Sequence, residues 1–104
     1  MGETVKHGDY EWDTSKAKLN RKKHGVSFEE AITAFNDVHA LQLSDPRYAD
    51  RFILIGMSDR ARVLFVVHCE IDDSGGYRHS RTRVISARIA HKTEALQYAL
   101  GDAQ

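Results

Sequence analysis

The chain has 104 residues, of which 41% are hydrophobic and 29% are charged, and its formal net charge is zero. These values predict one globular domain over residues 1–104, with room for a single core. No apolar run reaches membrane-spanning length and no signal-peptide pattern opens the chain. The one cysteine, Cys69, excludes an internal disulfide and favours a reducing, cytoplasmic compartment.

The charges are unevenly distributed along the chain. Residues 60–92 carry seven lysines or arginines against three acidic residues, and residues 36–59 carry four aspartates against two arginines. The negative charge of an acidic connector can therefore offset the positive charge of a basic sheet, so that the net charge is zero while an anion-binding site remains on the sheet.

The N-terminal part predicts a short strand followed by a helix. Residues 1–9 have no pattern and are expected to be disordered. Residues 10–12 alternate like a short edge strand. Asp13 is a good N-cap for a helix over residues 14–24, and Gly25 ends that helix as a C-cap.

This helix carries a polar stripe at positions i, i+4, i+7 and i+8. Its members are Lys16, Asn20, Lys23 and His24. Such a stripe is either a solvated face or a basic surface turned toward a phosphate, and the pattern alone leaves both interpretations open.

A second helix begins at a predicted capping box, in which the Ser27 hydroxyl accepts from the Glu30 amide and the Glu30 carboxylate reaches back. Its apolar positions, Phe28, Ala31, Ile32 and Phe35, have helical spacing and predict a stripe that packs on a sheet.

Three strands are expected next. Residues 40–43 form a short strand, residues 51–56 a buried strand and residues 63–70 a central strand. The tight connection at residues 58–61 predicts that the second and third of these are antiparallel neighbours.

The C-terminal part completes the sheet. A hairpin loop is predicted at residues 72–76, a strand at residues 81–88, and a final helix at residues 92–100 that ends at Gly101. This order predicts an α+β fold with an antiparallel sheet, two N-terminal helices packed on it and a C-terminal helix.

The central strand has a distinctive end. Both of its faces are apolar, but period-two alternation places His68 and Glu70 in line after Leu64 and Val66. A His/Glu pair at a strand end is either a structural hydrogen bond or a proton-transfer pair.

The arrangement fits RNA cleavage better than metal chemistry. The six histidines show no paired ligand spacing, so no metal or cofactor is expected. Cleaving RNA requires a base for the 2′-hydroxyl proton, an acid for the leaving oxygen, and cations for the charge on phosphorus. His68 is the natural proton carrier, and Arg83 and Arg88 are natural phosphate ligands. Period-two alternation places these two arginines on opposite faces of the strand. Either a bulge or the strand end must bring them to one face, or one of them is structural.

Motif residues between Tyr10 and Tyr98 carry a resemblance to a known family. They are Trp12-Asp13, Lys16, Asn20, Lys23-His24-Gly25-Val26-Ser27-Phe28-Glu29-Glu30-Ala31, Phe35, Asp37, Arg51-Phe52, Ile55-Gly56, Ser58, Arg62, Leu64, Val66-Val67-His68, Glu70, Arg83, Ile85-Ser86-Ala87-Arg88, Ala90, Glu94 and Tyr98. In this order they resemble the BrnT family of type II toxin–antitoxin toxins. The chain departs from the family in its long polar N-terminus and in the enlarged loop at residues 72–80.

The resemblance implies a RelE-like fold, a metal-independent endoribonuclease that arrests translation, and neutralisation by a BrnA-type antitoxin. It also implies a hetero-oligomer with that antitoxin and contact with operator DNA only through it. Together with the residue chemistry, it suggests a catalytic set of His68, Glu70, Arg83 and Arg88, and an RNA-binding set of Lys16, Lys23 and His24.

Two other functions stay open. A catalytically inactive RelE-fold protein would act as a co-repressor with its antitoxin. A direct DNA-binding regulator is the second alternative, but the sequence has no helix-turn-helix pattern and its basic residues lie mainly on predicted strands.

Overall fold

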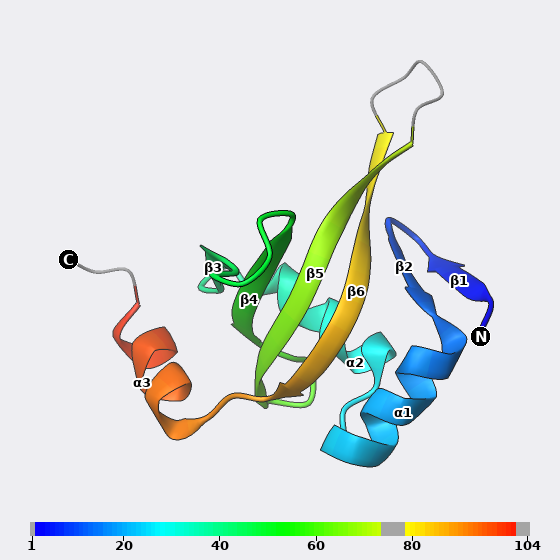
Figure 1. The fold of residues 1–104 in the computed structure, drawn as a ribbon. Helices are drawn as coiled ribbons and strands as arrows, with labels where there is room; N and C mark the ends of the chain where they lie inside the picture. The colour runs from blue at the N-terminus through cyan, green and yellow to red at the C-terminus, as the bar shows by residue number, and fades with distance from the viewer. Residues whose placement is uncertain (1, 74–78, 102–104) are drawn as a thin grey trace.

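The structure, a computed structural model, describes residues 2–73 and 79–101 (Figure 1). In chain order its elements are β1 (Thr4–His7), β2 (Tyr10–Asp13), α1 (Thr14–His24), α2 (Phe28–Thr33), the 3-10 helix η1 (Ala34–Asn36), β3 (Leu41–Ser44), β4 (Arg51–Met57), β5 (Val63–Asp73), β6 (His79–Ile89) and α3 (Lys92–Leu100). The fold is α+β, as predicted. None of the helices in this described part has the length and apolar content of a membrane span.

The six strands form one mixed sheet in the order β1-β2-β6-β5-β4-β3. The pair β4–β5 is antiparallel, which confirms the prediction. The prediction of a wholly antiparallel sheet is wrong, because β2 runs parallel to β6, with Tyr10 opposite Thr82 and Glu11 opposite Arg83. Most of the chain separates these two strands, so no tight turn forces them to be antiparallel.

The N-terminus also differs from the expectation of disorder over residues 1–9. Thr4–His7 pairs with Tyr10–Asp13 as an antiparallel hairpin. Gly8 has φ 62° in the turn, a conformation that glycine adopts without steric cost. The first strand is therefore held by its hairpin partner, although its own sequence has no apolar run.

Helix α1 has the predicted bounds and caps. The Asp13 carboxylate accepts from the amide of Lys16 at 2.9 Å, and Gly25 has φ 71° after the last turn. Asn20 is the one buried side chain of this helix. Its amide donates to the carbonyls of Val26 (3.0 Å) and Ala87 (2.7 Å), and its oxygen accepts from the Ala87 amide (3.0 Å). Helix α1 is thus tied to β6 by hydrogen bonds rather than by an apolar stripe.

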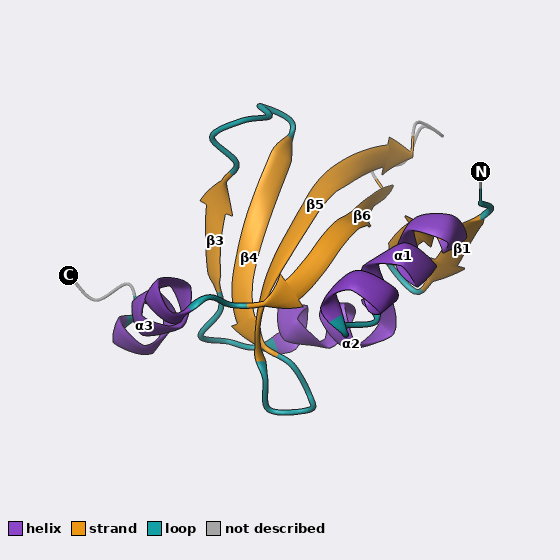
Figure 2. Cartoon of the chain, turned by 60° about the horizontal axis from the view of Figure 1, so that its bottom comes forward, coloured by secondary structure: helices purple, strands orange, loops and turns teal. Residues whose placement is uncertain are grey.

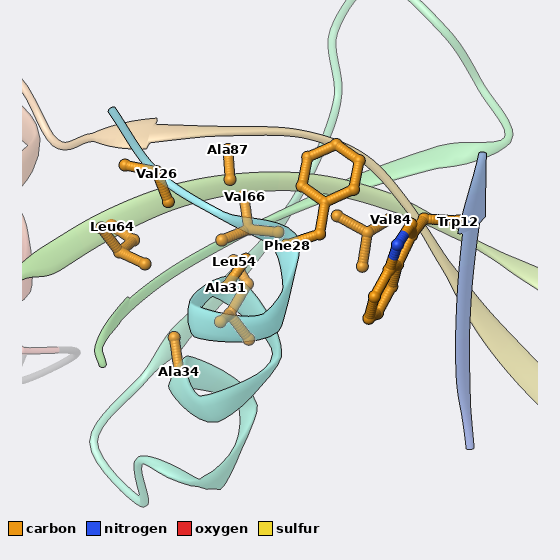
Figure 3. Close-up of a cluster of buried hydrophobic side chains, with 10 residues drawn as sticks. All are labelled: Trp12, Val26, Phe28, Ala31, Ala34, Leu54, Leu64, Val66, Val84 and Ala87. Carbon is orange, nitrogen blue, oxygen red and sulfur yellow. The ribbon is translucent and has the colours of Figure 1, made fainter. Parts of the chain in front are cut away.

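Helix α2 covers one face of the sheet and lies behind β5 and β6 in the view of Figure 1. The core on this covered face consists of Trp12, Val26, Phe28, Ala31, Ala34, Leu54, Leu64, Val66, Val84 and Ala87 (Figure 3). Burial of these side chains supplies the main apolar stabilisation of the fold.

The predicted capping box of α2 is only half formed. The Ser27 hydroxyl accepts from the Glu30 amide at 3.0 Å. The Glu30 carboxylate instead accepts from Ser58 Oγ (2.7 Å) and pairs with Arg62. A buried carboxylate needs a charged partner, and the hydrogen bond from Arg62 lowers the pKa of Glu30.

The second face of the sheet is more open. A small apolar cluster of Ile53, Ile55 and Val67 lies there, and Tyr98 of α3 packs against it. Helix α3 lies beyond the β3–β4 side of the sheet, while α1 lies at the β6–β2 side (Figure 2). The predicted loop at residues 72–76 falls partly on β5, where Asp72 pairs with Ser80, and its remainder lies outside the described residues.

Candidate functional site

A β-bulge in β6 arranges the two arginines predicted to bind phosphate. Val67 pairs with Ser86 and the next residue, His68, pairs with Val84, so Ile85 is an extra residue in β6. Arg83 lies opposite Cys69 and Arg88 opposite Phe65. Since Cys69 and Phe65 lie on one face of β5, the bulge brings both arginines to the open face despite their opposite parity.

Next to this bulge, α1 and β6 form a groove of about 210 Å³. It is lined by Lys16, Leu19, Asn20, Lys23 and His24 of α1 and by Ile85 and Ser86 of β6, and we call it the α1–β6 groove. All three residues predicted to bind RNA are therefore brought together. Arg83 and Arg88 lie within three residues of Ser86 along β6, a distance of about 10 Å or less at ~3.3 Å per residue.

Each arginine is held by a carboxylate. Arg83 Nη1 donates to Glu11 at 2.5 Å. Arg88 donates from Nη1 and Nη2 to the two oxygens of Glu94, at 2.8 and 2.9 Å, and its guanidinium lies 3.9 Å from the centroid of the Phe65 ring. The hydrogen bonds from Arg88 lower the pKa of Glu94, which keeps this carboxylate charged.

These contacts leave part of each guanidinium available. Within the described ranges, the Nε–H groups of Arg83 and Arg88 donate no hydrogen bond, and Nη2 of Arg83 is likewise unused. An arginine fixed at one edge can present its other edge as a planar fork to a phosphate. The open face thus holds two oriented arginines beside a lysine-lined groove.

His68 occupies a different environment from the one predicted. Strand β5 continues to Asp73, so His68 lies inside the strand rather than at its end. Its side chain is 1% exposed and lies between Phe35 (ring centroids 4.9 Å apart) and Phe52 (6.0 Å). Neither ring nitrogen has a hydrogen-bond partner among the described atoms, and burial lowers the pKa of His68 to about 4.

The predicted pairing of His68 with Glu70 is not present among the described contacts. Glu70 is exposed and accepts from Thr82 Oγ1 at 3.1 Å. Both residues alternate with Leu64 and Val66 on the covered face, whereas Arg83 and Arg88 lie on the open face. The predicted catalytic set is therefore divided between two sides of the sheet.

Sequence reasoning missed the two carboxylates that orient the arginines. Glu11 lies between two aromatic residues in a short strand, and it is buried. A buried carboxylate requires a positively charged partner. A glutamate in such an aromatic strand was therefore the available signal. Glu94 also accepts from the His91 amide at 2.7 Å at the start of α3. In the portion of the chain described, no three His, Cys, Asp or Glu side chains are grouped to hold a metal ion.

Comparison with known families matches residues 12–94 to the family described as "Ribonuclease toxin, BrnT, of type II toxin-antitoxin system". The matched range includes α1, the β6 bulge, both arginines and Glu94. A search of curated proteins finds no match.

Proposed function

We propose that this chain, which belongs to the BrnT family of ribonuclease toxins of type II toxin–antitoxin systems, cleaves RNA at the α1–β6 groove and so arrests translation. One observation carries the proposal: the bulge in β6 places Arg83 and Arg88 on the open face, beside the groove that Lys16, Lys23 and His24 line. Cations gathered along a groove bind a nucleic-acid backbone through its phosphates.

The arginines supply the electrostatic part of the reaction. Attack of the 2′-hydroxyl on the adjacent phosphorus builds negative charge on the phosphate oxygens. Arg83 and Arg88 are already oriented by Glu11 and Glu94, so little reorganisation is needed when this charge develops. Because the substrate brings its own nucleophile and the protein supplies the cations, we propose a metal-independent endoribonuclease.

The proton-transfer role of His68 with Glu70 stays a prediction. In this conformation the ring of His68 is enclosed by Phe35 and Phe52 on the covered face. In this position the ring does not line the α1–β6 groove.

A toxin of this class implies an antitoxin partner. We propose that the partner is of the BrnA type, forms a hetero-oligomer with this chain in the cytoplasm, and provides the only contact with operator DNA. An inhibitor that buries the groove should present acidic side chains, because an unpaired buried cation costs several kcal/mol. The RelE-like fold is proposed on the family resemblance together with the α+β arrangement.

The decisive experiment is a cleavage assay with purified chain freed from its antitoxin. We expect single-stranded RNA to be cut, and the same oligonucleotide with 2′-deoxynucleotides throughout to remain intact. Added antitoxin should abolish cleavage. An intact RNA substrate after prolonged incubation with folded protein would overturn the proposal.

A charge-matched pair of variants tests the groove itself. Lys16→Gln/Lys23→Gln removes two groove cations, and Lys18→Gln/Lys22→Gln removes two exposed cations of α1 that do not line it. The first pair should weaken RNA binding about tenfold or more and reduce the salt slope of binding by roughly 1.4, at about 0.7 per phosphate contact on a single strand. Equal effects of the two pairs would show non-specific attraction.

The alternative of an inactive co-repressor has one observation in its favour. Both arginines already have carboxylate partners, so their charge is partly neutralised before any ligand binds. A chain that binds its antitoxin tightly but leaves RNA intact would establish that function instead.

A further inference from the structure

We propose that His24 is the general base of the reaction and accepts the 2′-hydroxyl proton of RNA. This assignment rests on the proposed function and names the group that performs its first step. It is carried by the position of His24 in the α1–β6 groove, beside the lysines and next to the bulge of β6.

His24 is fixed relative to the strand that carries the arginines. It is the last residue of α1, followed by Gly25, whose amide donates to Arg21 O at 2.8 Å and whose carbonyl accepts from Arg62 Nη2 at 3.2 Å. One helical turn earlier, Asn20 is hydrogen-bonded to both the amide and the carbonyl of Ala87 in β6. The end of the helix therefore cannot move independently of the bulge.

The other groups of the groove are unsuited to accept a proton. Lysine and arginine carry their full set of protons near neutral pH, and an amide or a serine hydroxyl is not a base there. The amide of Asn20 is already committed to three hydrogen bonds. Among the residues that line the groove, His24 alone has a side chain that is a base near neutrality.

The imidazole of His24 is also accessible and uncommitted. It is half-buried, and within the described chain its side chain makes no hydrogen bond or ion pair. His68, by contrast, is enclosed on the other side of the sheet, and His39 lines the hollow beside Tyr98. The charged residues that line the groove with His24 are Lys16 and Lys23. Three arginines lie on the neighbouring elements, each paired with a carboxylate: Arg62 with Glu30, Arg83 with Glu11 and Arg88 with Glu94. A phosphate drawn to these cations would bring its 2′-hydroxyl close to the imidazole.

The proposed step balances without a co-reactant. The 2′-oxygen forms a bond to phosphorus as its proton passes to the neutral imidazole of His24. The bond from phosphorus to the 5′-oxygen then breaks with its electron pair, and that oxygen takes a proton from solvent. The products are a 2′,3′-cyclic phosphate and a 5′-hydroxyl, and His24 returns its proton to water.

The test compares His24→Gln with His39→Gln, a matched exposed histidine away from the groove, in single-turnover cleavage of a short RNA between pH 5 and 9. His24→Gln should lower the rate by about two to four powers of ten and abolish the rise in rate on the acidic side of the pH profile. Binding of an all-2′-deoxy oligonucleotide and the thermal midpoint should change little. Imidazole added to His24→Ala should restore part of the activity.

The outcomes separate this inference from the proposed function. If wild type cleaves RNA while His24→Gln retains both its rate and its pH profile, His24 is not the base and the RNA-cleaving function stands. A lower rate with an unchanged acidic limb and no imidazole rescue would also overturn the assignment, because it would indicate a binding role only. No cleavage by wild type would overturn both.

Discussion

The two faces of the sheet have different tasks, and two histidines show the difference. On the covered face, His68 is enclosed by Phe35 and Phe52 and has no hydrogen-bond partner in the described structure. On the groove side, His24 is half-buried beside two lysines and the bulge of β6. The same type of side chain is thus packed between two phenyl rings in one place and is our proposed proton acceptor in the other. Solvent access and neighbouring charge decide which.

The sharpest way to break this comparison is to replace His68. His68→Phe should keep the fold, because it fills the site without buried unpaired nitrogens, and should leave RNA cleavage within about threefold of wild type. His68→Ala should cost roughly 2 to 4 kcal/mol of unfolding free energy by opening a cavity. Urea unfolding and cleavage assays measure both. If stable His68→Phe loses cleavage by two or more powers of ten, His68 is catalytic and the contrast between the faces fails.

The pH dependence of stability tests the covered face on its own. Burial lowers the pKa of His68 to about 4 from an ordinary value of 6.5, so between these values the unfolded chain binds the extra proton. Stability should therefore fall as pH drops from about 6.5 to 4, by up to about 3 kcal/mol at 1.36 kcal/mol per pH unit. His68→Phe should lack this loss. The lowered pKa values of Glu30 and Glu94 add losses centred at lower pH, which remain in the variant.

On the open face, Arg88→Lys tests whether orientation matters beyond charge. Lysine keeps the positive charge but lacks the planar fork that can hold Glu94 with one edge and a phosphate with the other. Cleavage should fall about tenfold to a hundredfold, and Arg60→Lys, at an exposed arginine, should have no effect. Full activity of Arg88→Lys in a single-turnover assay would reduce the role of Arg88 to general electrostatics.

The smallest expected effect concerns the carboxylate behind Arg88. Glu94→Gln removes the charge and one of the two hydrogen bonds to the guanidinium, so Arg88 should be less well oriented and cleavage should fall by roughly threefold to tenfold. Glu29→Gln, an exposed carboxylate of α2, is the matched control. Faster cleavage by Glu94→Gln would mean that Glu94 masks Arg88 instead of positioning it.

Local sequence determined much of this protein. The bounds of α1, its Asp13 and Gly25 caps, and the apolar stripe of α2 depend on interactions within a few residues, and they were predictable for that reason. The gathering of Lys16, Lys23 and His24 was predictable too, because helical spacing alone places them on one stripe. Family resemblance over nearly the whole chain gave the class of protein, which the match over residues 12–94 confirms.

Tertiary structure decided the rest, since it depends on pairing between residues far apart in sequence. The bulge at Ile85 depends on how β5 and β6 are aligned with each other, and it places Arg83 and Arg88 on one face. The burial of His68 depends on Phe35 and Phe52, from two other elements, and the partner of Arg83 comes from β2, 72 residues away. Alternation along a strand predicts which residues share a face. Only the packed neighbours on that face determine whether a histidine there meets solvent, a phosphate or two phenyl rings.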